Sequence, residues 1–161
     1  MRGDKLTVIG AGTMGHGIAG QAAWRGLEVH LYDPSLEALT HGHSQIQKVY
    51  QKGVARQKMS ASEAEEALGR LHLHHPTGDD RALIEAASDA SIVIEAAPEK
   101  MEIKRSIFTV LESAVSAQTL LATNTSSLSI SKIAQCLTQP DRFLGMHFFN
   151  PVAVMPLLEI V

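Results

Sequence analysis

Gly10-Ala11-Gly12-Thr13-Met14-Gly15 is the stretch that decides the fold of this chain, because it matches the pattern G-x-G-x-x-G. The turn follows the apolar run Leu6-Thr7-Val8-Ile9 and precedes residues 14–25, which are rich in glycine and alanine. A strand, a glycine turn and a helix in this order form a phosphate-binding βα unit. A glycine-rich turn in an ordinary βαβ unit is the alternative, and the flanking sequence has to decide between the two.

The residues of the turn have distinct expected tasks. Gly10 permits a tight turn out of the strand, Gly12 lets the backbone approach a pyrophosphate, and Gly15 lets the helix pack on the sheet. The helix N-terminus offers unpaired N–H groups to the phosphates. We therefore assign the whole turn to cofactor binding, that is Gly10, Ala11, Gly12, Thr13, Met14 and Gly15.

Asp33 favours the dinucleotide interpretation. A second apolar strand, Glu28-Val29-His30-Leu31-Tyr32, ends on this carboxylate, about 20 residues after the glycine turn, where an acceptor for an adenosine ribose 2′-OH is expected. A carboxylate here would repel a 2′-phosphate, and the following Pro34-Ser35 offers no arginine to receive one. The sequence therefore predicts NAD rather than NADP as the cofactor.

Length and composition limit the number of domains, the cellular compartment and the classes of partner that we expect. The 161 residues suffice for one domain with a sizeable core. No apolar run approaches the ~20 residues of a membrane span, and the early first strand predicts no signal peptide. Cys136 is the single cysteine, which predicts a reducing cytoplasm and a small packed side chain rather than a nucleophile. A formal charge of −3 without a basic stripe argues against nucleic acid as a partner.

Hydrophobic spacing predicts an α/β fold of the doubly wound Rossmann type. We expect a mostly parallel sheet, a C-terminal edge hairpin and a protruding helical hairpin in a single domain over residues 1–161. Ser60 and Glu63 form an expected capping box for the second helix of that helical hairpin. After Asp33, the expected helices cover 35–58, 60–68, 79–87, 99–115 and 129–137, and the expected strands cover 71–75, 91–97, 119–124, 143–149 and 156–161.

The predicted strand Leu71-His72-Leu73-His74-His75 carries three histidines, which raises the question of a metal site. No cysteine or carboxylate accompanies them at ligand spacing along the chain. We therefore interpret these side chains as histidines at the solvent-facing or core edge of a strand, and we predict no metal site.

Two polar residues stand out in the apolar C-terminal stretch, His147 and Glu159. If the flanking strands form a hairpin through the proline-bounded loop, the two residues are equidistant from its midpoint, Ala153, and meet across the strands. A carboxylate beside an imidazole fixes the ring tautomer and stabilises the protonated ring. A structural histidine with an exposed glutamate is the alternative. The dinucleotide turn favours the base, because oxidation of an alcohol by hydride transfer needs an acceptor for the hydroxyl proton.

The chain resembles the NAD-binding domain of the L-3-hydroxyacyl-CoA dehydrogenase family. The resemblance is carried by residues 8–19, Glu95-Ala96-Ala97-Pro98-Glu99, Asn124-Thr125-Ser126-Ser127-Leu128-Ser129-Ile130 and Gly145-Met146-His147-Phe148-Phe149-Asn150-Pro151. It implies that His147 is the catalytic base, Glu159 its partner, and Ser126 a hydrogen-bonding contact of the substrate C3 oxygen beside the nicotinamide.

The same resemblance implies contacts of Glu99, Lys104 and Asn150 with the ribose and nicotinamide side of NAD. Lys52 matches a lysine that meets the CoA part of an acyl-CoA substrate, whereas Gln45 replaces a family serine one turn earlier. Family members continue into an all-helical domain of about 100 residues that covers the acyl group and forms a homodimer. We expect such a domain beyond Val161, and we expect this chain alone to be inactive or weakly active.

Two other functions stay open at this point. One is a related NAD-dependent dehydrogenase of a free hydroxy acid or sugar acid, which would not need a CoA contact at Lys52. The other is a non-catalytic NAD-binding module. Ser126, His147 and Glu159 argue against that module, and the expected but absent helical domain argues for it.

Overall fold

A seven-stranded sheet forms the centre of the computed structural model, which describes residues 5–76 and 78–161. The strands lie in the order β3-β2-β1-β4-β5-β6-β7, and all neighbours are parallel except β6 and β7. The strands are β1 (Lys5–Ile9), β2 (Glu28–Tyr32), β3 (Leu71–His74), β4 (Ile92–Glu95), β5 (Leu120–Thr123), β6 (Phe143–Phe148) and β7 (Leu158–Ile160).

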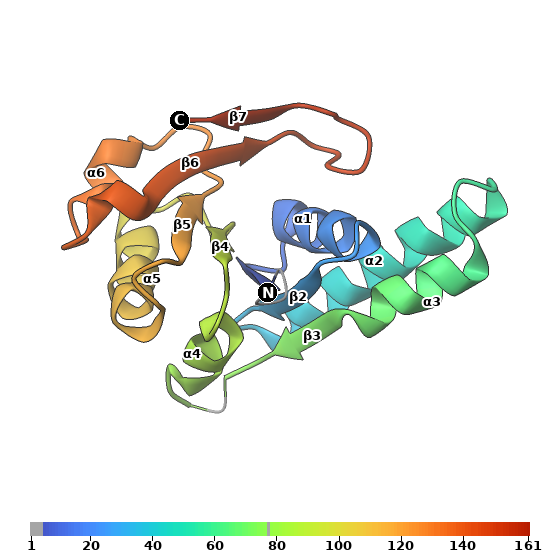
Figure 1. Cartoon of the computed structure of the whole chain (residues 1–161), viewed down its shortest axis with the longest axis horizontal. Coiled ribbons are helices and arrows are strands. Elements are labelled where there is room, and N and C mark those ends of the chain that lie inside the picture. The colour runs from blue at the N-terminus through green and yellow to red at the C-terminus, as the bar shows by residue number, and fades with distance from the viewer. Residues whose placement is uncertain (1–4, 77) are drawn as a thin grey trace.

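Helices cover both faces of the sheet, with α1 to α3 on one side and α4 to α6 on the other (Figure 1). They are α1 (Thr13–Trp24), α2 (Leu36–Ala55), α3 (Ala61–Gly69), α4 (Arg81–Ala87), α5 (Met101–Ala114) and α6 (Ile130–Ala134), with a short 3-10 helix at Pro140–Arg142. This three-layer arrangement confirms the predicted doubly wound α/β class.

The central strand β1 is covered on both faces, which explains its consecutive apolar residues. Val8 belongs to the core beneath α1 and α2, whereas its neighbour Ile9 belongs to the core beneath α4 and α5. Successive side chains of a strand point to opposite faces, so a strand covered on both faces is apolar at consecutive positions.

The helical hairpin of α2 and α3 extends from the sheet as predicted (Figure 1). Ser60 and Glu63 form the expected capping box at the start of α3. The helix α2 ends at Ala55, three residues before the predicted end at 58. Gln57 adopts a left-handed φ of 55°, and the N–H groups of Gln57 and Lys58 bond back to Val54 and Gly53, so the helix closes there.

Other element ends also differ from the expected ones. The strand β4 ends at Glu95 instead of 97, because the Ala97 N–H is taken by the Glu95 side chain rather than by a neighbouring strand. The helix α6 ends at Ala134 instead of 137, where turn bonds from Cys136 and Leu137 three residues back replace the helical pattern.

The C-terminal hairpin has the predicted register. Antiparallel β6 and β7 pair His147 directly with Glu159, between the pairs Met146–Ile160 and Phe148–Leu158. The loop between the two strands reaches over the start of α1 (Figure 1), where Val152 lies beside Gly17. The hairpin therefore brings the C-terminal polar pair to the edge of the sheet that carries the glycine turn.

No helix in the described part of the chain combines the length and the apolar character needed to cross a membrane.

Candidate active site

The glycine turn closes tightly between β1 and α1. Gly10 has a φ of +100°, and a Cβ atom there would lie 2.6 Å from the carbonyl oxygen of Ala96. A Cβ atom on Gly15 would lie 1.7 Å from the Gly10 carbonyl oxygen, so only glycine lets α1 start this close to the strand. Gly12 has no atom within 4 Å of an added Cβ, because its backbone faces open space. The surroundings of Gly10 and Gly15 match the tight turn and the close helix packing expected from the sequence, and the role of Gly12 at a pyrophosphate stays a prediction.

Asp33 braces the turn from the end of β2. One carboxylate oxygen accepts a hydrogen bond of 2.8 Å from the Ala11 N–H, and the other accepts one of 2.8 Å from the Ser35 N–H. Each oxygen retains a further lone pair, and the residue lines the cleft above the turn. Asp33 is thus held rigidly where a ribose hydroxyl could donate to it.

A cleft of about 1080 Å³ opens at the carboxyl ends of β1, β2, β4 and β5. The reversal of strand order between β1 and β4 creates this opening, which is the usual ligand site of doubly wound sheets. The predicted site residues that line it are Gly10, Gly12, Thr13, Met14, Asp33, Glu99, Ser126, His147 and Asn150.

Three predicted cofactor residues lie behind the cleft wall rather than in it. Ala11 and Gly15 are buried in the turn, where they support its shape. Lys104 on α5 is fully buried, so the structure does not bring its side chain into the cleft as a direct contact. This placement indicates that Lys104 positions neighbouring acidic side chains.

Lys104 joins two carboxylates through a network that sequence reasoning missed. Its Nζ lies 2.7 Å from Glu95 Oε1 and 3.3 Å from Glu99 Oε2, and it also donates to the Ala97 carbonyl oxygen at 3.3 Å. Glu95 is itself fully buried and accepts from the Thr123 hydroxyl at 2.7 Å. An isolated glutamate in the apolar strand Ile92-Val93-Ile94-Glu95 was the signal that could have indicated a buried cation nearby.

Glu99 holds the loop after β5 in place. Its Oε1 accepts hydrogen bonds from the Thr125 hydroxyl and, at 3.1 Å each, from the Ser126 N–H, the Ser127 N–H and the Ser127 hydroxyl. Partial burial raises the pKa of the Glu99 carboxyl, but these hydrogen bonds and the Lys104 charge outweigh burial and lower the pKa to about 2. A stable anion therefore fixes Ser126 at the cleft.

His147 and Glu159 form the expected pair. The Nδ1 atom of His147 lies 2.9 Å from Glu159 Oε2, across the two strands of the hairpin. A proton on Nδ1 donated to the carboxylate leaves the Nε2 lone pair free, and His147 lines the cleft. Asn124 supports this strand from the other side, because its Oδ1 accepts from the Phe148 N–H at 2.8 Å. In that tautomer His147 offers a proton acceptor at Nε2.

A second cavity of about 500 Å³ adjoins the first between α1, α2 and the loop that follows Asn150. Thr13 and Asn150 line both cavities. Lys52 lines only the second one, together with three further cationic residues, Arg25, Arg56 and Lys58. The arrangement places positive charge around a cavity next to the cleft.

Comparisons with known proteins agree with this geometry. The family model described as "3-hydroxyacyl-CoA dehydrogenase, NAD binding domain" matches residues 5–161. The chain is 47% identical over 156 residues to 3-hydroxyadipyl-CoA dehydrogenase of Escherichia coli K12, covering 97% of this chain and 31% of that protein. It is 40% identical over 159 residues to 3-hydroxybutyryl-CoA dehydrogenase of Mycobacterium tuberculosis, covering 98% and 53%.

Solved structures give the same result. FadB2 of Mycobacterium tuberculosis superposes with a TM-score of 0.89 at 39% identity, covering 98% of this chain and 53% of that one. For 3-hydroxybutyryl-CoA dehydrogenase of Escherichia coli K12 the TM-score is 0.88 at 44% identity, covering 99% and 32%. The chain therefore spans about half, or less, of the length of these relatives.

Proposed function

Because the chain belongs to the family of 3-hydroxyacyl-CoA dehydrogenase NAD-binding domains, we propose that it is the cofactor-binding and proton-transferring part of an enzyme that interconverts (S)-3-hydroxyacyl-CoA and 3-oxoacyl-CoA. The observation that carries this proposal is the His147–Glu159 pair of 2.9 Å at the wall of a cleft that also contains the glycine turn. A module that only bound NAD would not need an oriented proton acceptor there.

The residues of the cleft divide the chemistry between them. NAD, when bound, would be the acceptor of the hydride from C3. His147 Nε2 accepts the proton of the substrate 3-hydroxyl while the C3–H bond breaks and the C3 carbonyl forms, and Glu159 stabilises the imidazolium that results. Ser126 offers its hydroxyl to the C3 oxygen from the loop that Glu99 fixes. In the reverse direction the imidazolium returns the proton to the oxygen.

The cofactor residues are assigned on the same basis. The N–H groups at the start of α1 would hold the pyrophosphate, and Asp33 would accept from the adenosine ribose. Glu99 and Asn150 line the same cleft as His147 and would contact the ribose and nicotinamide side of NAD. A carboxylate at Asp33 is the feature that supports NAD over NADP.

The basic second cavity supports an acyl-CoA substrate rather than a free hydroxy acid. Lys52, Arg25 and Arg56 line a cavity that shares Thr13 and Asn150 with the cleft, and phosphate groups of CoA are the part of the substrate that such charges would bind. A free acid carries no group that would reach them. Comparing turnover of a 3-hydroxyacyl-CoA with that of the free 3-hydroxy acid tests this point directly.

We also propose that a helical domain completes the enzyme, covers the acyl group and forms a homodimer. Large apolar side chains near the C-terminus support this idea, because Val154 is 72% exposed, Ile160 59% and Val161 72%. Location in the cytoplasm is part of the same proposal and rests on the use of a single cysteine.

Replacing the base tests the proposed function. In the full-length enzyme, His147→Gln should lower kcat by about 10² or more while NADH affinity stays unchanged, because the side chain handles the proton and not the cofactor. NADH consumption with a 3-oxoacyl-CoA measures the rate, and fluorescence titration measures the affinity. A variant that retains its kcat would end the catalytic assignment, and a variant that loses only thermal stability would show that His147 is structural.

A further inference from the structure

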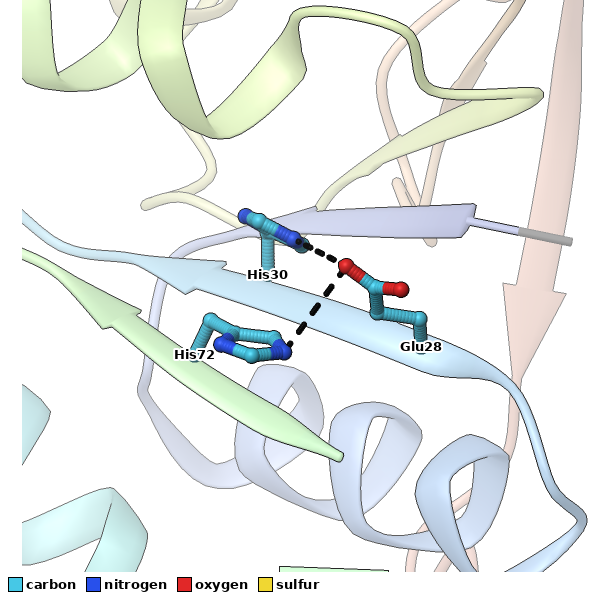
Figure 2. A group of neighbouring side chains, drawn as sticks. All are labelled: Glu28, His30 and His72. Atoms are coloured by element: carbon cyan, nitrogen blue, oxygen red, sulfur yellow. Dashed lines mark hydrogen bonds and ion pairs between the residues drawn. The ribbon is translucent and has the colours of Figure 1, made fainter. Parts of the chain in front are cut away.

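A cluster of histidines lies on the sheet at a distance from the cleft. The strands β2 and β3 are parallel neighbours in which His30 pairs with His72, and Tyr32 pairs with His74. Side chains two residues apart on a strand share a face, so Glu28 joins His30 on the same side. Figure 2 shows both imidazoles directed toward one carboxylate oxygen of Glu28. The carboxylate that was missing along the chain is thus supplied by the adjacent strand.

The three potential ligand atoms are close together. Glu28 Oε1 lies 3.1 Å from His30 Nε2 and 3.8 Å from His72 Nε2 (Figure 2), and all three atoms lie within 4.8 Å of one another. A tetrahedral Zn²⁺ ion with bonds of about 2.0–2.2 Å holds its ligand atoms roughly 3.4 Å apart. Small side-chain rotations therefore bring this trio to coordination distance.

The side chains of the three proposed ligands differ in their exposure to solvent. The His30 side chain is only 13% exposed, whereas those of His72 and Glu28 are 45% and 57% exposed. One ligand is fixed by packing, and the other two leave a path from solvent and a free fourth position. The separation of 3.8 Å between His72 and Glu28 is too long for a hydrogen bond, so the two groups are not already committed to each other.

His74 supplies the outer contact that an imidazole ligand needs. Its Nε2 lies 2.7 Å from His30 Nδ1, so one of the two nitrogens carries the shared proton. Once an ion replaces the hydrogen bond between His30 Nε2 and Glu28, a proton on Nδ1 lets His30 donate to His74 while its Nε2 lone pair binds the ion. Such a bond orients a metal-binding histidine and fixes its tautomer.

We propose that Glu28, His30 and His72 bind a Zn²⁺-type divalent ion, with His74 as the positioning partner of His30 and water at the fourth position. Two imidazoles and one carboxylate are a ligand set that Zn²⁺ accepts. The ion would tie the edge strand β3 to β2 and so stabilise the sheet. None of these four residues lines the dinucleotide cleft, so this site is independent of the proposed dehydrogenase function.

The neighbouring charge of Lys5 acts against the site. Lys5 on β1 lies opposite Glu28 in the register and donates to the Ser88 carbonyl oxygen, so its positive charge opposes a bound cation.

The test uses tag-free full-length protein stripped with a chelator and then titrated with Zn²⁺ against an indicator dye. We expect one equivalent to bind and the melting temperature to rise. Glu28→Gln and His72→Gln should each lower the affinity about tenfold or more, and His74→Phe should lower it about 10- to 100-fold. His41→Gln, which changes an exposed histidine on α2, is the matched control and should bind as the wild type does.

Metal-free melting curves and NADH titration of each variant show whether it has folded. For a variant that melts at a lower temperature without metal, the rise caused by Zn²⁺ replaces the absolute temperature as the readout. Absence of stoichiometric binding to the wild type would overturn the proposal. Equal loss in His41→Gln and His72→Gln would also overturn it, because that result would indicate unspecific binding to surface histidines.

Discussion

Removing the buried Lys104 cation should destabilise the fold strongly, and Lys104→Met is the appropriate perturbation. Methionine keeps the apolar part of the side chain, so the change chiefly removes the charge and three contacts of Nζ, at 2.7 Å to Glu95, 3.3 Å to Glu99 and 3.3 Å to the Ala97 carbonyl. Glu95 then remains as a fully buried carboxylate without its cation.

The expected magnitude follows from what each carboxylate retains. Loss of one partner from a buried ion pair costs about 3–5 kcal/mol. The lower end applies to Glu95, because the Ala97 N–H at 2.6 Å and the Thr123 hydroxyl at 2.7 Å still donate to it. The side chain of Glu99 is 35% exposed, so solvent screening limits its share to about 1 kcal/mol or less. A total of about 3–4 kcal/mol corresponds to a fall in Tm of about 6–16 °C.

Urea unfolding followed by circular dichroism measures this loss, with the double variant Lys104→Met/Glu95→Gln as the control. Removing both charges leaves no buried anion, so we expect the double variant to be more stable than Lys104→Met alone. A loss below about 1 kcal/mol in the single variant, or losses that simply add in the double variant, would refute the reasoning.

Four further outcomes are expected. Asp33→Ala should weaken NADH about 10- to 100-fold by fluorescence titration and NADPH much less, since the lost acceptor is a charged one; equal losses would contradict its ribose role. Glu159→Gln should lower kcat at least about tenfold with little change in Tm, because its side chain is 54% exposed. Gly15→Ala should lower both Tm and NADH affinity, because the new Cβ would meet the Gly10 carbonyl at 1.7 Å; wild-type melting would show that α1 can shift. Burial lowers the pKa of His74 from 6.5 to about 4, so its contribution to stability is complete above about pH 6.5 and is lost as the pH falls through 4; His74→Gln should flatten the dependence of Tm on pH in that window.

Local chemistry explains how much of the fold could be predicted from the sequence. The glycine turn, the capping box at Ser60 and the alternation of apolar residues act over a few positions, and the structure has each of them where it was expected. Helix ends were less predictable. The end of α2 depends on the left-handed backbone of Gln57, and a glutamine side chain does not indicate that conformation.

The candidate site was predictable where residues lie in a motif or in a single hairpin. The pairing of His147 with Glu159 followed from equal distances to a turn, and the observed register agrees with it. The burial of Lys104, and its link between Glu95 and Glu99, was not predictable in this way, since it depends on how α5 packs against the ends of β4 and β5.

The sequence by itself therefore determined the class of fold, the cofactor turn and the identity of the polar pair, because these depend on contacts between near neighbours or on a single hairpin. Only the tertiary structure decided which polar groups from distant parts of the chain lie close together. Glu28 and His72 lie far apart along the chain and come together because β2 and β3 are adjacent parallel strands. Parallel strands are joined by long crossovers. The spacing of residues along the chain therefore does not predict which side chains meet between two parallel strands.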